Sequence, residues 1–198
     1  MDRLKLYLDK ITNLSSDTYQ EILGILTERQ YKKEDFFAKD GKVETRFGIV
    51  LDGLFHAYIS KDNGTQYTKT FFTPIHFKMP ISFMGALSSL VTQTINHVNI
   101  EALTKATVLE GNFTELMNLA DRNKEVADWY RKLIELFFIG KERREFEYFS
   151  LQADARYKLF RQQYPELENL ISQYYIAQFI GITPTQLSRI RKKIFAEQ

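Results

Sequence analysis

The chain has 198 residues, with 27 Lys and Arg against 25 Asp and Glu, so its formal net charge is +2 and bulk charge indicates no particular partner. The absence of cysteine excludes disulfides, thiolate zinc sites and cysteine nucleophiles, and it fits a reducing compartment. The sequence has no signal-peptide pattern, and no apolar run approaches the roughly 18 residues of a membrane span. We therefore expect a cytoplasmic protein without a membrane partner.

The first half of the chain changes from a helical to a strand-like pattern. Apolar residues at three- and four-residue spacing predict helix over residues 4–29. Asp-Gly and Asn-Gly pairs then recur about every 11 residues and separate short aromatic and β-branched segments, which is typical of antiparallel hairpins. The expected strands cover residues 47–51, 54–60, 66–72, 96–103 and 106–109. This pattern predicts a small antiparallel barrel or roll.

The second half is helical, with a long helix expected over about 123–149 and a shorter one over about 152–163. The long helix carries an apolar seam at heptad-like spacing, formed by Val126, Trp129, Tyr130, Leu133, Leu136 and Phe137. Such a seam predicts a parallel homodimer, and packing against the chain's own roll is the alternative. Both can hold on different faces, because Ile134, Phe138 and Ile139 are apolar as well.

The segment from Gln173 to Lys192 carries the signals of two helices joined by a tight turn. Gly181 stands where the first helix would stop, because glycine accepts the left-handed C-cap conformation. Thr183 and Gln186 have the spacing of a capping box, and Pro184 falls at the first position of the second helix. These signals predict a helix-turn-helix.

The outer face of the second helix is polar and basic. Arginine can bond guanine and glutamine can bond adenine in the major groove, while further cations suit phosphates. The candidate DNA-binding residues are Thr183, Thr185, Gln186, Ser188, Arg189, Arg191, Lys192 and Lys193. The alternative is an ordinary helical hairpin with a solvated basic end.

Three stretches resemble the Crp/Fnr (cyclic AMP receptor protein) superfamily of bacterial transcription regulators, and in particular its short Bacteroidetes-type members. IAQFIGITPTQLSRIRKKI is similar to the DNA-binding helices of that family. FGIVLDGLFHAYISKDNGTQYTKTFF is similar to the middle of its cyclic-nucleotide-binding roll, and FMGALSSL resembles its phosphate-binding cassette.

The resemblance implies an α+β fold in three parts. An antiparallel β-roll of the cyclic-nucleotide-binding type, with flanking helices, would occupy residues 1–120. A long dimerisation helix would follow over 121–150, and a helix-turn-helix domain over 151–198. The resemblance also implies a homodimer on a roughly palindromic double-stranded DNA operator, RNA polymerase as a further candidate partner, and no enzyme activity.

The family's base-reading positions fall on Pro184, Thr185 and Arg189. Proline cannot make a polar side-chain contact, so the resemblance departs at the first of these positions. We therefore expect Thr185, Ser188 and Arg189 to read bases, joined by Gln186 if it leaves its cap.

The cassette departs from the family members that bind cyclic AMP. Those members hold the ribose with a Gly-Glu pair and the phosphate with an Arg-Ser or Arg-Thr pair, but here the pairs are Gly85-Ala86 and Asn96-His97. A buried phosphate without a cation is costly, so we expect no response to cyclic AMP and no cofactor. The candidate pocket for another effector consists of Gly85, Ala86, Leu87, Ser88, Asn96 and His97, beside the apolar run 77–83. A purely structural roll is the alternative.

Two other classes of function are compatible with a roll. His56, His76 and His97 are about twenty residues apart, so no metal-ligand spacing is visible and a cupin-like metal enzyme is disfavoured. No catalytic or metal-binding residue is therefore predicted. The other class is a ligand sensor or scaffold whose helix-turn-helix no longer binds DNA, which salt-sensitive DNA affinity would distinguish.

Overall fold

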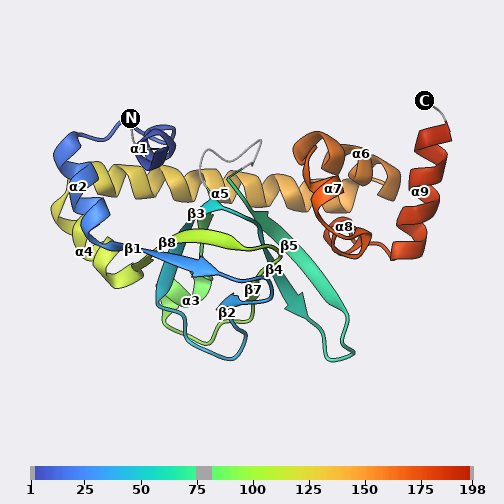
Figure 1. The fold of residues 1–198 in the computed structure, drawn as a ribbon, viewed down its shortest axis with the longest axis horizontal. Helices are drawn as coiled ribbons and strands as arrows, with labels where there is room; N and C mark the ends of the chain where they lie inside the picture. The colour runs from blue at the N-terminus through green and yellow to red at the C-terminus, as the bar shows by residue number, and fades with distance from the viewer. Residues whose placement is uncertain (1–2, 75–81, 197–198) are drawn as a thin grey trace.

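The computed structural model describes residues 3–74 and 82–196, and Figure 1 shows how they are arranged along one long helix. Two short helices come first, then a β-roll, then a helical half. The helices are α1 (Arg3–Asp9), α2 (Ser16–Gly24), α3 (Leu87–Thr92), α4 (Phe113–Arg122), α5 (Lys124–Ser150), α6 (Ala153–Gln163), α7 (Leu167–Leu170), α8 (Gln173–Ile180) and α9 (Pro184–Ala196). Within the described ranges no helix is both long enough and apolar enough to span a membrane.

The roll is built from two antiparallel sheets, with strand orders β1-β8-β3-β6 and β2-β7-β4-β5. The strands are β1 (Leu26–Tyr31), β2 (Phe36–Ala38), β3 (Arg46–Asp52), β4 (Phe55–Ser60), β5 (Gln66–Phe72), β6 (Phe83–Met84), β7 (Asn99–Ala102) and β8 (Ala106–Asn112). The predicted tight turns are present, since Gly53 has φ +88° and Gly64 has φ +78°, values that glycine adopts readily. The antiparallel roll predicted from the sequence is confirmed.

Side chains fill the space between the two sheets. Phe37, Phe55 and Met84 have 0% exposed surface. A Cβ atom placed on Gly48 would lie 2.8 Å from Cγ1 of Val108. Because a core at this density resists even one added methyl group, the described interior of the roll is a closed core.

The N-terminal segment corrects one prediction, because residues 4–29 do not form one helical region. The chain leaves α1 at Asp9, whose carboxylate accepts a hydrogen bond from the Leu14 amide at 3.1 Å. The Ser15 hydroxyl then caps α2 by accepting from the Thr18 amide. Residues 26–31 are strand β1, paired along its length with β8. This pairing with a distant strand overrides the local helical spacing.

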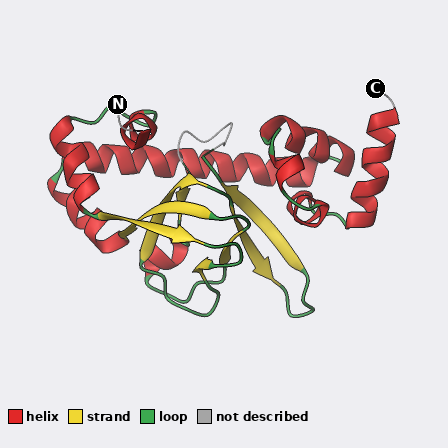
Figure 2. Cartoon of the chain, in the orientation of Figure 1, coloured by secondary structure: helices red, strands yellow, loops and turns green. Residues whose placement is uncertain are grey.

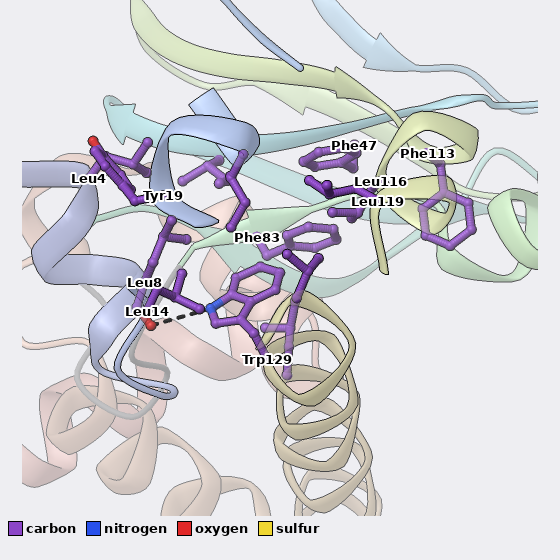
Figure 3. Packing of buried hydrophobic residues seen from close by; sticks show 14 of the residues in the cluster. Leu4, Leu8, Leu14, Tyr19, Phe47, Phe83, Phe113, Leu116, Leu119 and Trp129 are labelled. Atoms are coloured by element: carbon purple, nitrogen blue, oxygen red, sulfur yellow. Dashed lines mark hydrogen bonds between the residues drawn. The ribbon is translucent and has the colours of Figure 1, made fainter. Parts of the chain in front are cut away.

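The N-terminal half of α5 packs against the chain's own roll (Figure 3). Trp129 has its ring 6.4 Å from the ring of Phe83, and its indole Nε1 donates to the Leu8 carbonyl at 3.3 Å. Val126 and Leu133 have 0% exposed surface in the same cluster. This part of α5 therefore holds the N-terminal helices and the roll together.

The C-terminal helices share a second core with the roll, and Figure 2 shows them gathered at the other end of α5. Phe71 from β5 is 1% exposed, with its ring 5.2 Å from that of Phe179 on α8 and 6.0 Å from that of Tyr164. The helix-turn-helix is thus attached both to α5 and to the second sheet.

Candidate nucleic-acid interface

The turn between α8 and α9 is a glycine-capped helix end. Gly181 has φ +73° and ψ +41°, and its amide donates to the Ala177 carbonyl. The Ile182 amide donates to the same carbonyl at 3.0 Å. A Cβ atom on Gly181 would lie 2.5 Å from Cε2 of Tyr148 on α5, so both the conformation and the close approach require glycine here.

The predicted capping box at the start of α9 is confirmed. The Gln186 amide donates to Oγ1 of Thr183 at 3.2 Å, and the Thr183 amide donates to Oε1 of Gln186 at 3.0 Å. Pro184 is the first residue of α9. These reciprocal bonds satisfy two donors that a helix start leaves without partners, and they hold the Gln186 side chain against the backbone of Thr183.

One face of α9 is buried and the other is exposed. Leu187 and Ile194 are 0% and 5% exposed and fix the helix to the cluster around α6 and α8. The outward side chains that the sequence assigned to DNA and the structure leaves exposed are Thr183, Thr185, Gln186, Ser188, Arg189, Lys192 and Lys193. The predicted helix-turn-helix with a polar, basic outer face is therefore present.

Arg191 differs from the free basic side chain that the sequence suggested. Its Nη2 lies 3.7 Å from Oε1 of Glu168, and its guanidinium lies over the ring of Phe195. Arg161 contacts the other oxygen of Glu168 at 2.9 Å. Arg191 therefore shares its charge with a carboxylate of its own chain, and a phosphate contact by this residue stays a prediction.

A concavity of about 550 Å³ lies beside the recognition helix. Its lining residues are Gln173, Ser188, Arg191, Lys192, Phe195 and Ala196. Gln173, the first residue of α8, lines this shallow concavity and was not among the residues predicted from the sequence.

The candidate effector residues do not form one pocket. Asn96 is 4% exposed, and its amide nitrogen donates to the carbonyls of Lys39 and Val98 while its oxygen accepts from the Val98 amide. His97 points outward with 80% of its side chain exposed, 3.5 Å from Asp40. Asn96 therefore supports the surrounding loop, whereas His97 faces solvent, and an effector site that includes both stays a prediction.

The cassette segment itself lies at β6 and α3. Gly85 and Leu87 are half-buried, Ala86 is buried and Ser88 is exposed. A Cβ atom on Gly85 would lie 3.0 Å from Cδ1 of Leu90, so this glycine packs against the following helix. Of the apolar run 77–83, residues 77–81 lie outside the described part of the chain, as does His76.

A partly exposed cation of the roll, Arg46, is already paired with protein groups. Arg46 contacts Glu44 at 3.2 Å and Glu110 at 3.4 Å, and it donates to the Phe37 carbonyl at 2.5 Å. The Tyr31 hydroxyl donates to Glu110, and burial together with that bond raises the pKa of Tyr31. Two carboxylates thus neutralise Arg46, which leaves little of its charge for an anionic ligand.

The residues of the dimer seam predicted on α5 pack against the chain's own roll and N-terminal helices. Val126, Trp129 and Leu133 are at most 2% exposed, and half-buried Tyr130 and Phe137 pack against the same core. Leu136 is half-buried as well. The alternative, packing against the chain's own roll, holds for this face. Other large apolar side chains of α5 are exposed instead: Phe138 (58%), Ile139 (59%), Phe146 (68%) and Phe149 (78%).

The two described histidines, His56 and His97, lie in different surroundings. His56 is 1% exposed on β4, whereas His97 lies on the surface. Among the residues described, no three His, Cys, Asp or Glu side chains are grouped so that they could hold a metal ion.

No protein-family model and no curated protein matches the sequence. Solved structures do match. The c-di-GMP-responsive global regulator CLP of Xanthomonas campestris has a TM-score of 0.70 at 14% identity, over 92% of this chain and 93% of that one. FixK2 from Bradyrhizobium japonicum has a TM-score of 0.69 at 17% identity, over 87% and 86%.

A third match is a protein from Eubacterium rectale assigned to the Crp/Fnr family of transcriptional regulators, with a TM-score of 0.67 at 16% identity, over 93% of this chain and 85% of that one. The structure therefore has the Crp/Fnr fold: a roll, a long helix and a helix-turn-helix in that order. The fold class predicted from the sequence is confirmed.

Proposed function

We propose that this chain is a transcription regulator that binds double-stranded DNA sequence-specifically as a homodimer. The observation that carries the proposal is the outer face of α9, where Thr185, Ser188 and Arg189 are exposed while Leu187 and Ile194 anchor the inner face. Recognition helices of this plan enter the major groove, where arginine can bond guanine bidentately. That solved proteins of the same fold are transcriptional regulators supports this assignment.

The exposed apolar face of α5 supports the dimer. Ile139 and Phe146 are seven residues apart and Phe149 follows three residues later, which is the spacing of a helix seam. Exposed apolar side chains gathered on one helix mark an interaction surface. We propose that α5 of a second copy of the chain packs against this face. Helix-turn-helix regulators bind as symmetric dimers, in which each subunit reads one half of a palindrome.

The proposed regulator does not respond to cyclic AMP. Supporting this, Ala86 replaces the ribose-binding glutamate, Asn96 and His97 replace the phosphate-binding pair, and Arg46 is neutralised by its own chain. Isothermal calorimetry with cyclic AMP is expected to show no saturable heat, and micromolar binding would contradict this part of the proposal.

Selection from a random duplex library, using the purified chain without added ligand, tests DNA binding. We expect enrichment of a palindrome whose half-sites are centred about 10 base pairs, or roughly 34 Å, apart. RNA polymerase is the further candidate partner. Selected sites that lie beside promoters would be consistent with a contact between the two proteins. If no sequence is enriched and affinity for random duplex is insensitive to salt, the chain is a sensor or scaffold without DNA binding.

A further inference from the structure

Two arginines from other helices bind the C-terminal end of α8. Arg144 on α5 donates through Nη2 to the Phe179 carbonyl and lies over the Phe179 ring at 3.7 Å. Arg156 on α6 donates through Nε to the Ile180 carbonyl at 2.8 Å. Phe179 and Ile180 are the last residues of α8. The last carbonyls of a helix lack partners within it, and cations at that end are favoured by the helix dipole.

Arg156 also joins this helix end to the end of α5. Its Nη1 donates to the carbonyls of Tyr148 at 3.1 Å and Leu151 at 2.6 Å, and its guanidinium lies 5.2 Å from the centre of the Tyr148 ring. The same Tyr148 ring contacts the turn at Gly181. One planar, five-donor side chain therefore connects the last turn of the long helix with the turn that starts α9, a geometry that lysine cannot reproduce.

The opposite side of α8 is held by the second sheet. Thr68 on β5 donates to Oε1 of Gln178 at 3.2 Å, and Phe71 packs on Phe179. On β4, His56 meets the edge of the Tyr175 ring at 4.9 Å. Because α9 begins four residues after Ile180, its direction follows that of α8.

We infer that Arg144 and Arg156 are positioning residues that fix the angle between α5 and α9 and so determine which half-site spacing the dimer accepts. This inference rests on the proposed function. In a dimer joined along α5, the separation of the two recognition helices follows from the α5–α9 angle. Half-site spacing is therefore the property that a loosened attachment would change, while the outer face of α9 would keep its base preference.

The Arg144→Lys and Arg156→Lys variants, each measured separately, keep the positive charge but lose the planar fork. Arg143→Lys is the matched control, since Arg143 is adjacent, 59% exposed and bound to Glu147 of its own helix. Nε of Arg144 is buried without an acceptor among the described residues, so its replacement also removes an unpaired donor. Thermal unfolding of all three variants identifies any that are grossly destabilised.

The first readout is affinity for operators that carry the selected half-sites at spacings varied one base pair at a time. In each Arg144 and Arg156 variant we expect affinity for the preferred spacing to fall roughly tenfold, with less than about a threefold change at neighbouring spacings. The control should keep the wild-type profile. A variant profile that is unchanged, or lowered equally at every spacing, overturns the inference.

The second readout needs no DNA. Because the chain has no cysteine, Lys193→Cys places a single spin label on each α9 of the dimer. Electron paramagnetic resonance should give one narrow inter-label distance in the otherwise wild-type chain and a broadened distribution with Arg144→Lys or Arg156→Lys. Equal widths overturn the inference. A wild-type chain that selects no operator and binds random duplex independently of salt refutes the proposed function, whereas a selected operator with unchanged variants refutes the inference alone.

Discussion

Acidification should destabilise this chain through one buried imidazole. His56 is 1% exposed at the contact between β4 and α8, stacked on Tyr58 at 4.6 Å and meeting Tyr175 at 4.9 Å. Neither ring nitrogen has a hydrogen-bond partner among the described residues, and Nε2 lies 3.8 Å from the nearest oxygen of Glu101. Burial lowers the pKa of His56 from 6.5 to about 4, because a charged ring is poorly solvated there.

The sign and size of the effect follow from that shift. Below about pH 6.5 the unfolded chain binds a proton at His56 that the folded chain does not take up until about pH 4. The unfolded state is therefore favoured increasingly as the pH falls through this window. At 1.36 kcal/mol per pKa unit, the difference amounts to about 3 kcal/mol as an upper figure. Burial raises the pKa of Glu101, which acts in the opposite sense and offsets part of the loss.

Urea unfolding of the wild type and of His56→Phe at fixed protein concentration, between pH 7 and pH 4, isolates this contribution. The free energy of unfolding of the wild type should fall relative to that of the variant by up to about 3 kcal/mol over this window. His97→Phe removes an exposed imidazole and reports the effect of the substitution alone. If the difference between wild type and His56→Phe is the same at both ends of the window, the reasoning is refuted.

Three further predictions concern the interface, the dimer and the turn. Arg189→Ala should weaken operator binding by about 1–3 kcal/mol and relax base preference, whereas Lys193→Ala should weaken binding to operator and random duplex alike. Fluorescence anisotropy measures both affinities. Equal losses on the two duplexes for Arg189→Ala would contradict the base-reading role. Phe146→Asp should give a folded monomer in sedimentation experiments, and a persisting dimer would place the seam elsewhere. Gly181→Ala should lower the free energy of unfolding by about 2 kcal/mol or more, because φ is +73° and the added Cβ meets Tyr148; an unchanged urea midpoint would show that the turn relaxes.

The features that the sequence predicted well are those whose cause lies within a few residues. The capping box of Thr183 and Gln186 is local chemistry, and so is the left-handed turn at Gly181. Likewise, Gly53 and Gly64 indicate turns, because few other residues tolerate positive φ. The structure that such signals predict does not depend on contacts with distant parts of the chain.

The features that could not be predicted depend on distant partners. The apolar spacing through Trp129 and Leu133 shows that one face of α5 is covered, but a helical stripe does not reveal whether a second copy or the chain's own roll covers it. In the same way, the sequence does not show that Arg191 lies 3.7 Å from Glu168, a residue of a separate short helix. Asn96 was predicted to line a ligand pocket, but its side chain forms hydrogen bonds with backbone groups of the surrounding loop.

The packing of the roll also bears on what the roll contributes. Its described interior is closed around Phe37 and Phe55, while its outer side supplies Phe71 to the core beneath α8. The core that Phe71 shares with Phe160 and Phe179 attaches the helix-turn-helix to the roll, so the roll also supports the helix that precedes α9. A ligand of the roll would change the orientation of α9 only if it bound two arrangements of the molecule unequally, because a ligand shifts a conformational equilibrium only through contacts that differ between the two states.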